Sequence, residues 1–131
     1  MVKSTAPPTF GSTPARGERI LVLRQHWMNL ILNGEKTLEI RGKQLKQGDV
    51  WLGYRQEIVG KAYLGEAILI DSTESWDERR SQHRVETLFL PYKKTWGLPL
   101  TKVSRLRRKI AYVHPRGAVG IVRFTPPAIV K

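Results

Sequence analysis

Apolar and polar residues alternate along the chain from Thr37 to Arg41. This is the period of a β-strand with one face on a hydrophobic core. Leu38 and Ile40 are expected to point inward on such a strand. Thr37, Glu39 and Arg41 are expected to share the opposite face. The pattern therefore predicts a strand that carries a short row of polar and charged side chains.

The residues before this strand predict a strand, a short helix and a tight turn. Residues 20–23 are apolar without interruption, which is typical of a buried strand. Trp27, Leu30 and Ile31 follow at the i, i+3, i+4 spacing of an amphipathic helix. Gly34 is expected to end that helix in a left-handed conformation, because it lacks the Cβ atom that makes this conformation costly.

Further strands are predicted near residues 50–54, 58–70 and 118–124. A second helix is predicted to start at Ser75, because Ser75 and Glu78 have the spacing of a capping box. The expected fold class is α+β and mainly β, with a small barrel of about five or six strands and two or three short helices.

Length and proline content indicate how the chain is divided. A chain of 131 residues is expected to form one domain. Residues 1–17 hold three of the eight prolines and few apolar side chains, so we expect a flexible N-terminal tail there. The folded domain is predicted over residues 18–126, where a pair of prolines begins, with a C-terminal tail over 127–131.

Several function classes lack support in the composition. The chain has no cysteine, and His26, His83 and His114 lack the spacing of metal ligands, so we expect no metal and no cofactor. No apolar stretch is long enough to span a membrane. We therefore expect an intracellular monomer, cytoplasmic or nuclear, although the acid-free Ser, Thr, Ala and Arg content of residues 1–17 also permits organelle targeting.

The net charge of +12 is concentrated in the last third of the chain. Residues 87–131 carry 10 basic side chains and no acidic one. Basic groups neutralise phosphates, and the interleaved aromatic rings offer stacking surfaces for unpaired bases. We therefore expect a nucleic-acid partner, with RNA favoured over DNA. The candidate backbone-binding residues are Arg105, Arg107, Arg108, Lys109 and Arg116.

An alternative for this basic segment is an ordinary solvated helix. Val103, Leu106 and Ile110 fall at the i, i+3, i+7 spacing of a surface helix, and Thr101 is suited to be its cap. The complete absence of acid over 45 residues favours the binding interpretation, because mixed charges serve solubility equally well.

The segment from residue 23 to residue 41 resembles the signature of the ASCH domain family, which is G-x-K-x-x-E-x-R after a helix often opened by Q-P-W. Gly34, Lys36, Glu39 and Arg41 match the four motif positions, and His26 stands where Pro is usual. Residues 65–70 and 117–124 are similar to later strands of the family. The resemblance implies a PUA-like barrel with a nucleotide cleft beside the helix and first strands.

The resemblance also implies roles for individual side chains. Lys36 is expected to contact a phosphate or a base carbonyl, and Glu39 to accept from an exocyclic amine. Arg41 is expected to orient Glu39 or to clamp a phosphate, and Trp27 to form part of the pocket wall. A simpler alternative is that Glu39 and Arg41 form only a structural ion pair at the barrel end.

Two other functions are weighed against binding. Some bacterial ASCH-like proteins are amidohydrolases on N4-acylated cytidine that use a Lys, a Thr and a distant Glu, and others are ribonucleases. Lys36 matches that Lys, but Glu39 stands at the position of the Thr, so the candidate catalytic residues are Lys36, Thr37 and Glu39, with Glu66 as a possible aid. The third function is a protein-interaction module that recruits acidic partners through the basic surface.

Overall fold

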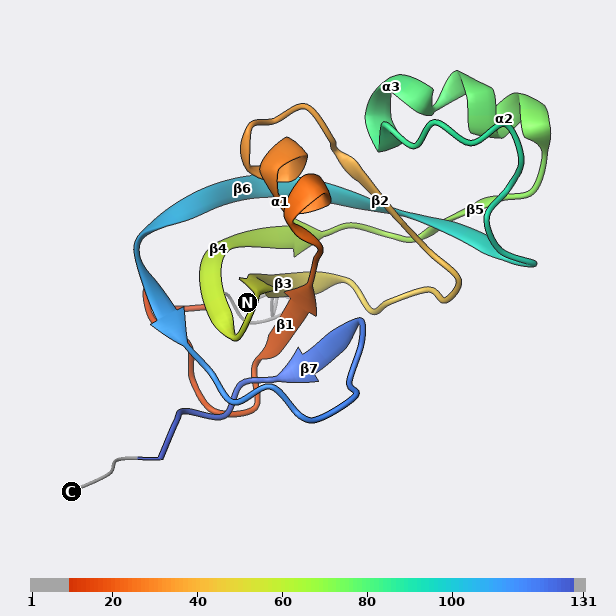
Figure 1. Cartoon of the computed structure of the whole chain (residues 1–131). Helices are drawn as coiled ribbons and strands as arrows, with labels where there is room; N and C mark the ends of the chain where they lie inside the picture. The colour runs from red at the N-terminus through yellow and green to blue at the C-terminus, as the bar shows by residue number, and fades with distance from the viewer. Residues whose placement is uncertain (1–9, 129–131) are drawn as a thin grey trace, which may run out of the picture.

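The computed structural model describes residues 10–128, which form a curled β-sheet with three short helices (Figure 1). The seven strands of this part are β1 (Arg19–Val22), β2 (Leu38–Arg41), β3 (Gly48–Tyr54), β4 (Glu57–Leu64), β5 (Ile68–Ile70), β6 (Thr95–Ala111) and β7 (Ile121–Arg123). The helices are α1 (Gln25–Leu32), α2 (Thr73–Glu78) and α3 (Arg80–His83). The predicted fold class, α+β and mainly β, is confirmed.

The long strand β6 joins the two parts of the sheet. The strand order is β2-β6-β4-β3-β1-β7, and β5 also pairs with β6. The first residues of β6 lie between β2 and β5, and the rest of β6 pairs with β4. Figure 1 shows β6 curving around the molecule as it passes from one part to the other. A strand that pairs with different partners along its length closes the sheet into a partial barrel.

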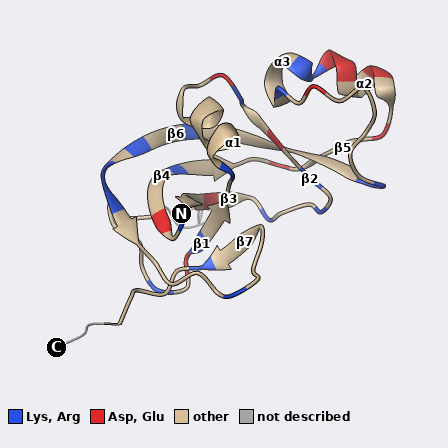
Figure 2. Cartoon of the chain, viewed as in Figure 1, with Lys and Arg blue, Asp and Glu red and all other residues tan. Residues whose placement is uncertain are grey.

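The sequence prediction missed β6, and the alternative of a helix over residues 101–110 is wrong. Gly60 pairs with Arg105 while Ile58 pairs with Ile110, so β6 advances five positions where β4 advances two. Because this bulge contains extra residues, the half-buried Leu106 and Ile110 are four positions apart in the sequence. This spacing is also typical of a helix. We call residues 105–110 the β6 bulge; Figure 2 shows basic residues along this outer part of β6.

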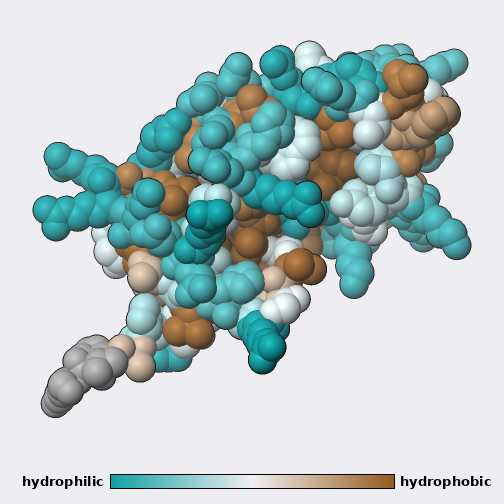
Figure 3. Space-filling model, in the orientation of Figure 1, coloured by the Kyte–Doolittle hydropathy of each residue, from teal (hydrophilic) through white to brown (hydrophobic). Residues whose placement is uncertain are grey.

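Three groups of buried side chains form the core. The first packs α1 against the sheet through Met28 and Ile31, and the second surrounds Trp51 between β1, β3 and β4. The third joins α2 to β2 and β5 through the fully buried Trp76. Burying each such side chain contributes about 1.5–3 kcal/mol. The visible outer surface is mostly hydrophilic, with apolar atoms showing in its hollows (Figure 3).

Several boundaries differ from the prediction, and β7, for example, covers only Ile121–Arg123 of the predicted strand 118–124. Residues 58–70 form two strands, β4 and β5, instead of one. Helix α2 begins at Thr73, because the Ser72 side chain accepts a hydrogen bond of 3.1 Å from the Ser75 backbone N–H and acts as the N-cap. Ser75, the predicted cap, lies inside the helix and uses its backbone to complete that cap.

The predicted N-terminal tail lies partly outside the described residues, which begin at residue 10. Residues 10–17 contact the barrel: the Phe10 ring stacks on Trp51 with 5.4 Å between centroids, and the Phe10 N–H donates to Asp49. The Gly17 N–H donates to the Phe124 carbonyl. Within the described part of the chain, no helix has the length and apolar character needed to cross a membrane.

Candidate functional site

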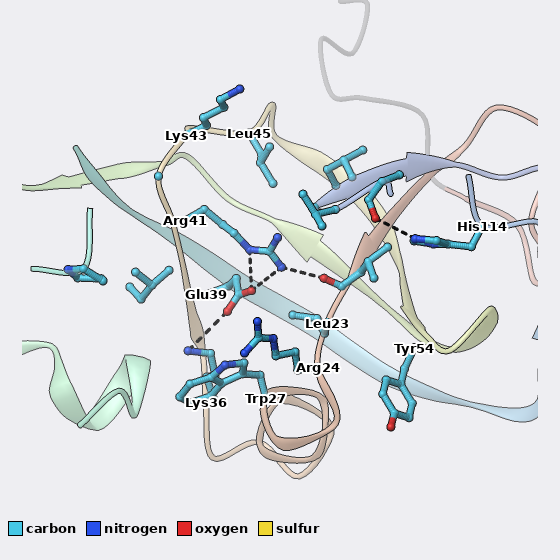
Figure 4. A pocket seen from close by; sticks show the side chains of 18 of the residues that line it. Leu23, Arg24, Trp27, Lys36, Glu39, Arg41, Lys43, Leu45, Tyr54 and His114 are labelled. Atoms are coloured by element: carbon cyan, nitrogen blue, oxygen red, sulfur yellow. Dashed lines mark hydrogen bonds and ion pairs between the residues drawn. The ribbon is translucent and has the colours of Figure 1, made fainter. Parts of the chain in front are cut away.

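A pocket of about 950 Å³ opens between α1, β2 and three loops (Figure 4). Trp27 lines it from α1, and Lys36, Glu39 and Arg41 line it from the turn before β2 and from β2 itself. The other walls come from three loops, which are the β3–β4 turn, the loop between α3 and β6, and the segment between β6 and β7, and from the residues that follow β1 and β2, which include Arg24 and Lys43. The four motif-region residues predicted from the sequence therefore lie in one cavity.

The turn at Gly34 sets the direction of Lys36. Gly34 has a φ of +79°, the left-handed conformation that the sequence predicted. The N–H groups of Glu35 and Lys36 then both donate to the Leu30 carbonyl at the end of α1, at 2.8 and 3.0 Å. The chain turns back under α1 through these bonds, so the Lys36 side chain enters the floor of the pocket and not the solvent.

Lys36, Glu39 and Arg41, which we call the ionic triad, contact one another directly. Glu39 Oε2 accepts a hydrogen bond from Arg41 Nε at 2.8 Å and forms an ion pair with Arg41 Nη2 at 2.7 Å. Glu39 Oε1 lies 3.6 Å from Lys36 Nζ. Arg41 Nη2 also donates to the Val22 carbonyl on β1 at 3.0 Å, as Figure 4 shows. The triad therefore ties β2 to β1 across the pocket floor.

Lys36 is an almost completely buried cation, with 1% of its surface exposed. Its Nζ donates to the His83 carbonyl at 2.5 Å and lies 4.4 Å from the centroid of the Trp27 ring. Burial lowers the pKa of Lys36 from its usual value, Glu39 opposes this shift, and Arg41 adds to it. The ammonium group thus contacts protein groups at the pocket floor, and the predicted contact of Lys36 with a ligand stays a prediction.

His83 holds the Lys36 partner in place. Its ring is buried and stacks on Trp76, with 3.8 Å between the ring centroids. Nδ1 accepts a hydrogen bond from the Val85 N–H, so the ring is neutral and its Nε2–H donates to the Trp76 carbonyl at 2.9 Å. Burial lowers the pKa of His83, and Lys36 contributes to that shift. Both ring nitrogens are therefore committed to the fold.

Two atoms of the triad retain free hydrogen-bonding capacity toward the pocket. Arg41 Nη1 donates to no atom of residues 10–128, and the Arg41 side chain is 21% exposed. Glu39 Oε1 has only the Lys36 contact at 3.6 Å, which exceeds hydrogen-bonding distance. The free donor and the free acceptor thus lie on opposite sides of the Arg41–Glu39 ion pair at the floor of the pocket.

The walls of the pocket are strongly cationic. Besides the triad, the lining contains Arg24, Lys43 and Arg55, so five cations and one carboxylate surround the cavity. Tyr54 and His114 add aromatic surface, and Figure 4 shows both across from Trp27 and the triad. The sequence analysis did not assign these five wall residues. Only Arg24 had a signal, because it lies within the matched motif segment.

The β6 bulge forms a second basic site. Arg105, Arg107 and Arg108 line a groove of about 920 Å³ between β6 and residues 12–13, together with Lys61. Lys109 is exposed on the same bulge. The three ion pairs found within residues 10–128 include no cation of β6. The predicted basic residues of this segment therefore form an uncompensated surface, apart from the bond of Arg105 Nη2 to Asn33 at 2.7 Å.

Three other predicted residues lie apart from the pocket. The Thr37 side chain is exposed and is absent from the pocket lining, and its backbone bonds Gln82 and Leu100. Glu66 is exposed between β4 and β5. Arg116 is exposed in the segment between β6 and β7, next to residues that do line the pocket. The Thr37 side chain therefore lies outside the pocket that Lys36 lines.

Comparison with known proteins identifies the family. The family model described as ASCH domain matches residues 21–116. This chain belongs to the ASCH domain family. ASCH domains are generally PUA-like modules that bind RNA. The match includes α1, the triad and the β6 bulge. No curated protein matches the sequence of this ASCH domain.

Solved structures from Zymomonas mobilis share its fold. The chain aligns with one point mutant of the ASCH protein ZmASCH at a TM-score of 0.65 and 17% identity, covering 86% of this chain and 92% of that chain. A second point mutant of ZmASCH gives a TM-score of 0.61 at 20% identity, with 73% and 76% covered. The structure of the ASCH protein without a mutation gives 0.58 at 20% identity, with 70% and 71% covered. These similarities confirm the fold.

Proposed function

We propose that this ASCH domain binds nucleic acid, with RNA preferred, by holding one nucleotide in the pocket and the phosphate backbone on the β6 bulge. The observation that carries the proposal is the free donor and acceptor pair, Arg41 Nη1 and Glu39 Oε1, at the floor of a cationic, aromatic-lined pocket. The edges of unpaired bases present both acceptors and donors to such groups.

The recognition of a base follows from the stiffness of the triad. Two nitrogens of Arg41 clamp one oxygen of Glu39, and Lys36 faces the other. A carboxylate between two cations stays ionised, so Glu39 Oε1 accepts from an exocyclic amine while Arg41 Nη1 donates to a neighbouring base oxygen or nitrogen. In this proposal Lys36 holds Glu39 in place and does not contact the ligand. The sequence had predicted a direct contact of Lys36 with the ligand.

The recognition of the backbone rests on exposed cations. Arg24 and Arg55 are exposed at the pocket wall, and Arg55 belongs to the turn between β3 and β4. Tyr112, directly after β6, donates its N–H to the Gln56 carbonyl in that turn, so the two sites are structurally adjacent. A strand that leaves the pocket over this turn meets the cations of the bulge.

Binding measured at several salt concentrations tests the proposal. Fluorescence anisotropy with labelled single-stranded RNA, single-stranded DNA and duplex RNA is expected to give the tightest binding for RNA. If about five phosphates are contacted, the logarithm of affinity falls against the logarithm of salt with a slope of roughly −3.5 on single strands. Absence of binding to every RNA and DNA at low salt would contradict the proposal.

Arg41→Lys provides the matched variant for the pocket. Lysine retains the positive charge but cannot reproduce the planar, two-pronged contact with Glu39. We expect Arg41→Lys to reduce discrimination between base identities more than it reduces the salt dependence. An equal loss on every sequence would mean that Arg41 contacts only phosphate.

One observation favours a hydrolase as the second candidate. Burial lowers the pKa of Lys36, as a lysine that serves as a general base requires. Against it, Thr37 lies outside the pocket lining and Lys36 Nζ is occupied by the His83 carbonyl. Turnover of N4-acetylcytidine or of labelled RNA that disappears in Lys36→Met would establish catalysis. Clean protein without turnover on either substrate would reject it.

A further inference from the structure

The loop between α3 and β6, residues 84–94, carries exposed aromatic and apolar side chains that the pocket does not use. Phe89 is 77% exposed and Leu88 is 69% exposed. We propose that this loop is a stacking platform for the base next to the one in the pocket, and therefore that the ligand is single-stranded. This inference rests on the proposed function and specifies its ligand.

The loop is held in place by hydrogen bonds along its length. Trp76 Nε1 and Arg80 Nη2 both donate to the Thr87 carbonyl, at 2.8 and 3.1 Å. The Thr87 hydroxyl donates to the Phe89 carbonyl at 3.1 Å. Near the other end, the Tyr92 N–H donates to Thr95 Oγ1, which donates back to the Tyr92 carbonyl at 3.0 Å. Phe89 is thus presented to solvent by an anchored backbone.

The same loop approaches the pocket directly. Val85, Pro91 and Tyr92 line the cavity. The Tyr92 ring lies against Gly42, where an added Cβ atom would come within 2.9 Å of the ring. Phe89 is two residues from Pro91, so their Cα atoms are at most about 7 Å apart. Phe89 therefore lies near the rim of the pocket at Pro91.

The charge of the loop favours an anionic ligand such as a nucleotide over a purely apolar partner surface. Lys93 and Lys94 are exposed just before β6, and the loop has one acid, Glu86, against three cations with Arg84. An aromatic face beside two cations is suited to an unpaired base and its phosphate. Figure 3 shows apolar atoms at the surface on the end of the molecule that carries α2 and α3. In a duplex the bases are stacked inside, and Phe89 cannot reach their faces.

The test compares two substitutions at one position. In anisotropy measurements with single-stranded RNA of about ten nucleotides, Phe89→Ala is expected to weaken binding by roughly 5- to 100-fold, the range for loss of one stacked base. Phe89→Leu is expected to lose nearly as much, because leucine keeps apolar bulk but has no aromatic face. Leu88→Ala, in the same loop and similarly exposed, is expected to leave affinity unchanged.

Two controls make the outcome specific. A nucleoside monophosphate is expected to bind wild type and Phe89→Ala equally, because it fills only the pocket. Unchanged oligonucleotide affinity in Phe89→Ala would overturn the platform while leaving the proposed function intact. Full retention of binding in Phe89→Leu would also overturn it, since that result indicates a general apolar contact of the kind a protein partner makes. Absence of any nucleic-acid binding by wild type would instead contradict the proposed function.

Discussion

The ionic triad and the β6 bulge hold positive charge in opposite ways. In the triad, Lys36 and Glu39 are buried, and each charge is paired with another charge within residues 36–41. In the bulge, Arg107, Arg108 and Lys109 are exposed, and none belongs to an ion pair found within residues 10–128. The triad depends on the fold for its geometry, whereas the bulge needs the fold only to bring cations together.

This difference separates specificity from general affinity. Buried charges are costly to desolvate and cannot move, so they define positions at which a ligand atom must match. Exposed cations remain hydrated and mobile, so they attract any polyanion and lose affinity as salt rises. Substitutions in the triad are therefore expected to change stability and base preference, and substitutions in the bulge to change only affinity and its salt dependence.

The largest expected effect follows removal of the shared carboxylate. Glu39→Ala leaves the buried Lys36 cation without its counter-charge, and we expect the free energy of unfolding to fall by about 3 kcal/mol. Urea denaturation followed by circular dichroism measures this change. Glu35→Ala, which removes an exposed carboxylate four residues earlier, is the matched control and is expected to stay within about 0.5 kcal/mol of wild type.

A double variant separates stability from binding at the same site. Lys36→Met combined with Glu39→Leu removes both buried charges, so we expect it to be more stable than Glu39→Ala alone. The double variant is still expected to lose base preference, because the acceptor is gone. If Glu39→Ala folds as stably as Glu35→Ala, the triad does not constrain the fold as described.

A smaller effect is expected from neutralising the bulge. Substitution of Arg107, Arg108 and Lys109 by Gln is expected to leave the unfolding free energy unchanged, because all three side chains are exposed. Loss of three phosphate contacts reduces affinity for single-stranded RNA roughly 100-fold at about 0.1 M salt and makes the salt slope shallower by about 2. Titrations at several salt concentrations measure both quantities.

Cations outside the bulge provide the control for the bulge variant. Lys43, Lys46 and Arg79 are not part of the bulge, and Lys43 alone among them lines the pocket. Substituting Lys46 and Arg79 by Gln is expected to change the salt slope less than the bulge variant does. An equal change would show that the affinity reflects net charge and not the bulge.

The sequence predicted the triad better than the bulge, and the reason is physical. Strand β2 and the Gly34 turn follow local rules: alternation of apolar residues and a glycine at a positive φ. Strand β6 breaks the alternation, because Lys102 has a φ of +52° and residues 105–110 bulge away from β4. Register shifts depend on the partner strand, and no local pattern encodes them.

The contacts of Lys36 also could not be predicted from the local sequence. Its partners are the His83 carbonyl, 47 residues away, and the Trp27 ring on α1. The sequence placed Lys36 in the motif but could not predict this carbonyl partner, because the packing of α3 beside β2 supplies it. The wall residues Tyr54, Arg55 and His114 come from turns whose positions likewise depend on tertiary contacts.

The smallest expected effect is a pH dependence that reaches the triad through His83. The folded protein holds His83 neutral and with a lowered pKa, so its contribution to stability is fully present above about pH 6.5, the pKa of an unperturbed histidine. As the pH falls below that value, the unfolded chain takes up a proton first. The free energy of unfolding is then expected to fall by about 1.4 kcal/mol per pH unit until the folded pKa is reached.

Denaturation midpoints measured between about pH 7.5 and 5.5 test this dependence. His83→Gln removes the titrating group and is expected to flatten the profile, whereas His26→Gln, at an exposed position on α1, is expected to keep the wild-type slope.

Protonation of His83 breaks the bond from the Val85 N–H and loosens the carbonyl that holds Lys36. Base preference is therefore expected to weaken over the same range, while the salt slope, which depends on the exposed bulge, stays constant. A profile that His83→Gln leaves unchanged would assign the pH dependence to another group.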